Sequence, residues 1–183
     1  MTDLNGKTIA FLCTNGVEQV ELTGPWQAIT EAGGRPVLVS LKPGTITAMN
    51  GDWEHGDTFD VDAVAAQSSA NRYDALVMPG GTLNADNVRL DEGARALVRG
   101  FFEAGKPVAS ICHGPWTLID AQVAKGRTMT SYVSIKTDLV NAGVNWVDEE
   151  VVVDNGLITS RNPGDLDAFN AAIVKEFAGS TPN

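Results

Sequence analysis

Short apolar runs alternate with longer amphipathic segments along most of the chain, and this alternation limits the folds that the chain can adopt. The runs predict strands at 9–13, 36–41, 75–78, 107–111, 151–153 and 157–160. They are too short for helices and too uniformly apolar for a half-exposed sheet, so the central strands should be buried on both faces. Amphipathic segments predict the covering helices, at 18–32, 91–104, 115–124, 135–142 and 166–177. The sequence therefore predicts an α/β protein with a doubly wound, mostly parallel sheet.

A glycine-punctuated segment at 42–67 interrupts this alternation. Glycines at 44, 51 and 56 separate two short stretches, 45–47 and 53–55. We expect a small hairpin here, at one edge of the sheet, with His55 exposed. A chain of 183 residues is typical of one domain, so residues 1–183 are predicted to form a single domain.

Composition narrows the class of protein. The formal net charge is −10 and the pI is near 4.5, without clustered lysine and arginine, which argues against nucleic acid as a partner. No apolar run approaches the roughly 20 residues that a membrane helix needs, and the first residues do not resemble a signal peptide. We therefore expect a cytoplasmic protein with no membrane partner. The two cysteines lie too far apart for a metal-site spacing or a disulfide framework, and no metal or organic cofactor is indicated.

The segment 105–116 is the most informative for chemistry, because an apolar strand ends on Cys112 and a helix begins within a few residues. Such a turn exposes a nucleophile at the carboxyl edge of a parallel sheet. Gly114 allows the sharp bend, and Pro115 suits the first helical position. The N-terminal end of that helix would stabilise a thiolate and lower the pKa of the thiol. The alternative is that Cys112 is a small buried side chain at the end of a core strand.

Three further positions are candidates by the same geometry. His113 is a possible base or donor beside the thiol, unless it faces solvent or a partner subunit. Glu18 begins a helix at the same sheet edge, where acidic residues also occur without any catalytic role. Gly81 would let backbone N–H groups approach a ligand or an oxyanion, or would simply allow a tight turn. Cys13 ends an apolar strand and is expected to lie in the core.

Five blocks in order along the chain, at 16–21, 76–81, 105–115, 149–154 and 160–166, resemble the PfpI-like branch of the DJ-1/ThiJ/PfpI superfamily. The block that ends in Cys-His-Gly-Pro is the most specific. The resemblance implies a flavodoxin-like three-layer sandwich of the class I glutamine-amidotransferase-like type. It also implies that Cys112 is the reactive thiol, with Glu18 hydrogen-bonded to it and His113 beside it. The amides of Gly81 and His113 would form the oxyanion site.

The resemblance further implies a homodimer or a larger homo-oligomer. In archaeal peptidase-type members, an acidic residue of a neighbouring subunit completes a Cys-His-Glu triad. The matching position here is Asp86, whose shorter side chain reaches less far. This difference puts the peptidase-type triad in doubt.

The activities that the resemblance implies fall into three classes, among which the fold cannot choose. We expect a stress-protective cysteine hydrolase or lyase that acts on reactive dicarbonyls or on glycated protein, of the deglycase or glutathione-independent glyoxalase type. Such substrates need only a small pocket, whereas an intracellular cysteine peptidase, the first alternative, also needs an extended cleft. The second alternative is a non-catalytic redox sensor or chaperone that uses oxidation of Cys112 to sulfenic or sulfinic acid.

Overall fold

A seven-stranded sheet forms the centre of the molecule, in a computed structural model that describes residues 3–180. The strands lie in the order β10-β11-β7-β6-β1-β2-β5. All neighbours pair in parallel except β10, which pairs antiparallel with β11. The bounds are β1 Thr8–Leu12, β2 Arg35–Ser40, β5 Ala63–Val64, β6 Ala75–Met78, β7 Val108–Ile111, β10 Val151–Asp154 and β11 Leu157–Ser160. The prediction of a mostly parallel sheet is confirmed.

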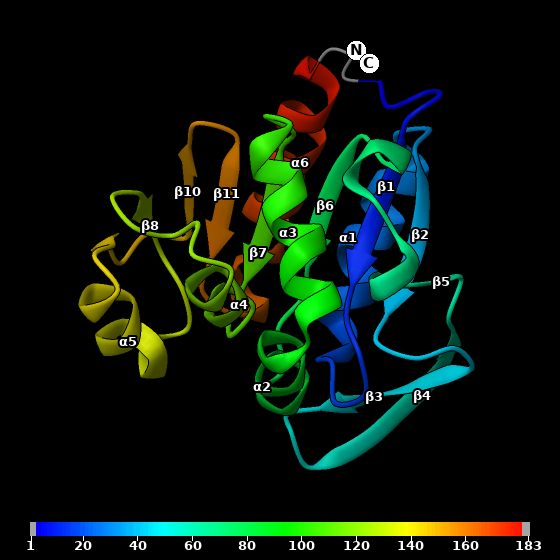
Figure 1. The fold of residues 1–183 in the computed structure, drawn as a ribbon, viewed down its shortest axis with the longest axis horizontal. Coiled ribbons are helices and arrows are strands. Elements are labelled where there is room, and N and C mark those ends of the chain that lie inside the picture. Colours follow the sequence, from blue (N-terminus) through cyan, green and yellow to red (C-terminus); the bar gives the residue numbers. More distant parts are fainter. Residues whose placement is uncertain (1–2, 181–183) are drawn as a thin grey trace.

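Helices cover both faces of this sheet (Figure 1). One face carries α1 (Gln19–Glu31) and α6 (Leu166–Gly179), and the other carries α2 (Thr82–Leu90), α3 (Glu92–Glu103) and α4 (Pro115–Asp120). Beside α4 lie α5 (Lys136–Asn141) and the short paired strands β8 (Thr128–Met129) and β9 (Asn145–Trp146). The predicted three-layer sandwich is confirmed. Between residues 3 and 180, no helix is both long and apolar enough to cross a membrane.

Alternate residues of β1 build the two apolar layers between sheet and helices. Ile9 and Phe11 pack in the core with α1 and α6, whereas Ala10 and Leu12 pack in the core with α3. All four are buried. A strand covered on both faces needs apolar side chains at every position, which is why this run is uniformly apolar. Burial of Phe11 alone stabilises the fold by roughly 1.5–3 kcal/mol.

The predicted hairpin forms a separate two-stranded antiparallel sheet of β3 (Thr45–Asn50) and β4 (Glu54–Asp60). It lies across the carboxyl ends of the parallel strands, below them in Figure 1. Met49 N–H donates to Val17 O at 2.8 Å, which fixes the hairpin to the turn between β1 and α1. His55 is exposed, as predicted. The hairpin turn at 51–53 therefore reaches the carboxyl edge of the sheet.

One helix was not predicted, and another is shorter than predicted. The sequence predicts only a loop after β6, whereas the structure has the helix α2 starting at Thr82. This helix was missed because polar residues such as Asn84 obscure its apolar period. The helix predicted to continue to 124 ends at Asp120, and Gln122 beyond it has a left-handed backbone with φ 62°. The start of α2 lies beside the site described next, since Thr82 lines its cavity.

Candidate active site

Cys112 occupies the predicted sharp turn between β7 and α4. Its φ is 63°, a left-handed conformation that strains a residue with a side chain and that neighbouring structure must hold in place. Cys112 N–H donates to Ser160 O at 3.1 Å, and its carbonyl accepts from Tyr132 N–H at 2.9 Å. Gly114 is required for this turn, because a Cβ there would lie 2.7 Å from Met78 O. Cys112 is 7% exposed and lines a cavity.

Groups from two predicted residues converge on the sulfur. His113 Nδ1 lies 3.2 Å from Cys112 Sγ. The backbone N–H groups of Gly81 and His113 lie near the thiol and act to lower its pKa. Gly81 can present its N–H from this position because its φ is 91°. The structure therefore brings together Cys112, His113 and Gly81.

The carboxyl beside the thiol is that of Glu21. Glu21 is fully buried in α1 and lies close enough for its carboxylate to raise the pKa of the Cys112 thiol. Its Oε2 accepts from Gly80 N–H at 2.8 Å, whereas its buried Oε1 has no hydrogen-bond partner. A Cβ on Gly80 would lie 2.5 Å from Glu21 Oε2 and 2.6 Å from Cys112 Cβ. Gly80 thus leaves the space in which carboxyl and thiol meet.

The prediction that Glu18 is hydrogen-bonded to Cys112 is wrong. Both carboxylate oxygens of Glu18 accept from Gly51 N–H in the hairpin turn, at 3.0 and 3.3 Å. Glu18 directly precedes α1, whereas Glu21 lies on the buried face of its first turn. Glu18 still lines the cavity at Cys112. It is part of the wall of the site rather than a partner of the sulfur.

Asp52 is a cavity residue that sequence reasoning missed. It lies in the turn between β3 and β4 with φ 67°. Its two carboxylate oxygens accept from Thr82 N–H at 3.1 Å and from the Thr82 hydroxyl at 2.8 Å, at the start of α2. The local sequence marks this turn through its glycines but gives no indication of what the turn covers. Only the tertiary structure places it in the wall of the Cys112 cavity.

Burial dominates the protonation of the central pair. It raises the pKa of Glu21 to about 8, against the lowering effect of the Gly80 N–H. Burial also raises the pKa of the Cys112 thiol, and the Glu21 carboxylate raises it further, against the N–H groups of Gly81 and His113. The prediction that the following helix lowers this pKa is therefore wrong. Protonation of Glu21 removes the charge that opposes the thiolate, so the two groups titrate as a pair.

His113 is held by contacts on both sides of its ring. Nε2 lies 3.1 Å from Ser134 Oγ, and the ring stacks on Tyr132 with centroids 4.8 Å apart. Burial lowers the pKa of His113, which favours the neutral ring at pH 7. In the tautomer whose Nε2–H donates to Ser134, Nδ1 is an acceptor facing Cys112 Sγ. His113 can therefore accept the thiol proton.

The cavity at Cys112 has a volume of about 480 Å³. Asp86 is not among its lining residues, since it lies exposed on α2. Its predicted contribution to the site of another subunit stays a prediction. Over the described range 3–180, no group of three His, Cys, Asp or Glu side chains is arranged to hold a metal ion.

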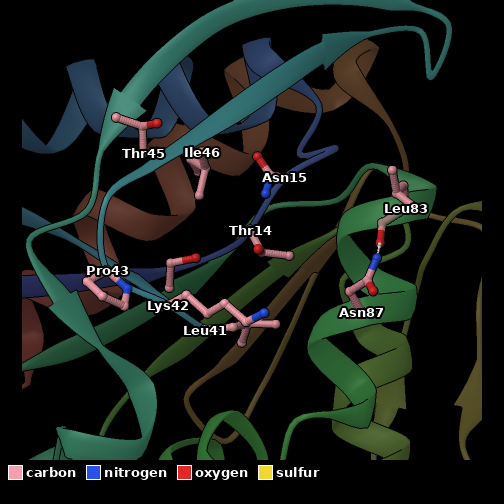
Figure 2. A pocket seen from close by; sticks show the side chains of 10 residues that line it. Thr14, Asn15, Leu41, Lys42, Pro43, Thr45, Ile46, Leu83 and Asn87 are labelled. Carbon is pink, nitrogen blue, oxygen red and sulfur yellow. Dashed lines mark hydrogen bonds between the residues drawn. The ribbon is translucent and has the colours of Figure 1, made fainter.

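A second cavity, of about 240 Å³, lies at the same edge of the sheet (Figure 2). Its walls come from the ends of β1 and β2, the start of β3, and α2, with Thr14, Lys42 and Leu83 among the lining residues. It shares no lining residue with the cavity at Cys112 and contains no thiol. Of these two cavities, only the first is lined by Cys112, His113 and Glu21.

Glu21→Gln is expected to flatten the pH dependence of stability. The folded-state pKa of about 8 exceeds the ordinary value of 4.5, so between these values the folded state binds more protons and its free energy of unfolding falls as pH rises. An amide does not titrate, so near pH 8 the variant gains stability relative to wild type, on the order of a few kcal/mol. Thermal unfolding at about pH 5 and pH 8 measures this difference. Glu54→Gln, at an exposed carboxylate, is the control, and equal pH slopes for Glu21→Gln and wild type would contradict the assignment.

The fold and this site together define an α/β domain with a cysteine on a strand-to-helix turn, a buried carboxyl beside the sulfur and two backbone N–H groups near it. The chain belongs to the DJ-1/PfpI family, whose model matches residues 7–176. This confirms the resemblance seen in the sequence.

Two relatives have names that indicate different activities. The chain is 45% identical over 167 residues to "Deglycase PfpI" of Pyrococcus furiosus, covering 91% of this chain and 97% of the relative. It is 42% identical over 165 residues to "Putative cysteine protease YraA" of Bacillus subtilis, covering 90% and 94%. The crystal structure of Drosophila melanogaster DJ-1beta matches with a TM-score of 0.85 and 30% identity, covering 94% of this chain and 91% of that one.

Proposed function

We propose that this protein is a cysteine enzyme that removes reactive dicarbonyls or early glycation adducts, of the deglycase or glutathione-independent glyoxalase type. The arrangement at Cys112 is the observation that carries the proposal. A thiol, a carboxyl with a pKa of about 8 and a neutral imidazole meet in one small cavity with two backbone donors. Attack on an aldehyde carbon needs these groups: a sulfur nucleophile, an acid–base group and donors for the oxyanion.

The proposed reaction begins with addition of Cys112 Sγ to the aldehyde carbon of the dicarbonyl. The sulfur–carbon bond forms as the thiol proton passes to His113 Nδ1, and the former carbonyl electron pair becomes an oxyanion facing the Gly81 and His113 N–H groups. Glu21, protonated at neutral pH, donates the proton that converts the oxyanion into the hydroxyl of a hemithioacetal.

The hemithioacetal then isomerises. The Glu21 carboxylate takes the proton from the carbon bonded to sulfur and returns it to the neighbouring carbon. In the same step protonated His113 gives its proton to the neighbouring carbonyl oxygen and takes the proton of the hemithioacetal hydroxyl, which gives a 2-hydroxy thioester. Water cleaves the thioester to a 2-hydroxy acid and frees the thiol. With an amine adduct as substrate, the sulfur first displaces the amine, so that the carbon–nitrogen bond breaks and the amine leaves protonated.

A cysteine peptidase is the second candidate, and the name of the Bacillus subtilis relative favours it. The same thiol and imidazole could attack a peptide carbonyl. The cavity of about 480 Å³ suits a small molecule better than an extended peptide.

The redox-sensor or chaperone alternative uses Cys112 without turnover. We keep a cytoplasmic homo-oligomer, in which Asp86 reaches a neighbouring site, as part of the proposal.

A substrate panel tests the proposal with the intact protein. Methylglyoxal, a preformed methylglyoxal adduct of Nα-acetyl-lysine and a fluorogenic peptide are each incubated with the protein, and free methylglyoxal, adduct and 2-hydroxy acid are quantified separately. We expect stoichiometric formation of 2-hydroxy acid from the first two substrates and slower peptide cleavage. Protein alkylated beforehand with iodoacetamide is the control. Peptide turnover without any 2-hydroxy acid would favour the peptidase, and no turnover with a reactive Cys112 would favour the sensor.

A further inference from the structure

Two carboxylates line the cavity of the nucleophile without taking part in the chemistry assigned to it. We propose that Glu18 and Asp52 make this cavity selective for substrates that carry a positive charge close to the reactive carbonyl. This inference rests on the proposed function, because it specifies the substrate class of the same site. The favoured substrates are carbonyl adducts with an ammonium or guanidinium group, and the disfavoured ones are oxo acids with a carboxylate.

Neutral donors hold both carboxylates in place. Glu18 accepts from Gly51 N–H, and Asp52 accepts from the N–H and hydroxyl of Thr82. Neither carboxylate forms a salt bridge within the described part of the chain. Backbone and hydroxyl donors fix the orientation of a carboxylate but leave its formal charge uncompensated. The two side chains therefore add negative charge to the cavity wall.

The remaining lining residues leave that charge unopposed. No lysine or arginine is among the described residues that line the cavity. The charge of Asp52 acts on Glu18, on Glu21 and on His113, so it reaches the groups around the sulfur. A cation in the cavity would compensate this charge, whereas an anion would add to it.

A second observation also points to a ligand in this cavity. Glu21 is fully buried and lines the cavity, and its Oε1 has no hydrogen-bond partner of good geometry. A buried polar atom without a partner is rare, and such atoms are normally paired in native structures. In the ionised form of Glu21 that the isomerisation uses, Oε1 is an acceptor, because Gly80 N–H already occupies Oε2. An ammonium or guanidinium N–H can donate to it, whereas a carboxylate cannot. The unpartnered oxygen and the two wall carboxylates thus favour the same ligand chemistry.

The position of Asp52 is fixed from both sides of the cavity. Its turn is bonded to Glu18 through Gly51 N–H and to α2 through Thr82. Asp52 is exposed, but these hydrogen bonds hold its charge beside Cys112. A fixed charge selects among ligands at the level of binding and of reaction rate.

Charge-matched thiol reagents test this selectivity without any turnover. The second-order rate of Cys112 modification is measured with a cationic, a neutral and an anionic methanethiosulfonate, in a Cys13→Ser background. Each rate is divided by the rate of the same reagent with 2-mercaptoethanol. We expect the normalised rate of the cationic reagent to be about tenfold or more above that of the anionic reagent. This ratio should fall as ionic strength rises. A ratio near one in wild type would overturn the inference.

Variants assign the effect to the two carboxylates. Glu18→Gln and Asp52→Asn retain the shape and an acceptor oxygen, and together they should reduce the ratio to within about threefold of one. Glu54→Gln is the matched control, because Glu54 is an exposed carboxylate on the same hairpin that does not line the cavity. An equal reduction in Glu54→Gln would attribute the ratio to the overall net charge of the protein and overturn the inference.

A substrate series separates this inference from the proposed function. Methylglyoxal hemithioacetals of thiocholine, 2-mercaptoethanol and 3-mercaptopropionate share one reacting group and differ in charge. We expect kcat/KM to decrease in that order for wild type and to become similar in the double variant. Turnover without such an order, together with a normalised labelling ratio near one, would overturn the charge selectivity and leave the enzyme proposal standing. A preserved labelling ratio without turnover of any member would support the charge selectivity and overturn the enzyme proposal.

Discussion

Cys112→Ser is expected to lose at least about a thousandfold in kcat/KM for methylglyoxal, because the proposed reaction forms its first covalent bond at this sulfur. A serine hydroxyl is a far weaker nucleophile at neutral pH, and neither Glu21 nor His113 can form the sulfur–carbon bond. Formation of 2-hydroxy acid by purified protein measures the effect. Thermal unfolding of the same sample shows whether the variant is folded.

Cys13→Ser is the matched control, since it removes the other thiol of the chain. Cys13 is fully buried, and burial raises its pKa to about 12, so this thiol is neither accessible nor ionised at neutral pH. We expect its turnover to stay within about twofold of wild type wherever the variant folds. Retained turnover in Cys112→Ser, or an equal loss in both variants, would remove Cys112 from the mechanism.

The layer arrangement was predictable because it follows from local patterns. Uniformly apolar strands such as 75–78 require cover on both faces, and the intervening amphipathic segments provide it. The missed helix α2 shows the limit of this reasoning. Its start at Thr82 depends on the Asp52 carboxylate, which is distant in sequence.

The position of Cys112 at a sharp strand-to-helix turn was predictable from the sequence around it, but the carboxyl beside its thiol was assigned to the wrong glutamate. One signal in the sequence could have corrected this. Glu21 lies on the same helical stripe as the buried Leu22, Pro25 and Ile29, so a charged residue occupies a core position of α1. A buried carboxyl is rare without a functional or pairing role. The raised pKa of the thiol could not be predicted, because it depends on burial.

Gly81→Ala is expected to impair both stability and catalysis. The φ of 91° disfavours any side chain, and a Cβ would lie 2.3 Å from Gly16 O and 2.6 Å from Glu18 N, which are backbone atoms that cannot rotate away. We expect a loss of about 3 kcal/mol or more in the free energy of unfolding, or roughly 6–12 °C in Tm for a chain of this size. The shift would also displace the Gly81 N–H from the Cys112 sulfur.

Gly126→Ala tests backbone strain alone, without the close approach of a new Cβ to backbone atoms that Gly81→Ala causes. Gly126 has a similar φ of 80°, but a Cβ there would meet nothing within 4 Å, so only the conformational penalty of about 1 kcal/mol applies. It should lower Tm by only about 2–4 °C and leave turnover unchanged. Gly81→Ala, assayed at a temperature where it is folded, should lose on the order of a hundredfold in kcat, as expected when one donor to a developing oxyanion is displaced. If Gly81→Ala matched Gly126→Ala in both Tm and kcat, the 80–81 loop could not be the rigid support of the sulfur and oxyanion that the structure indicates.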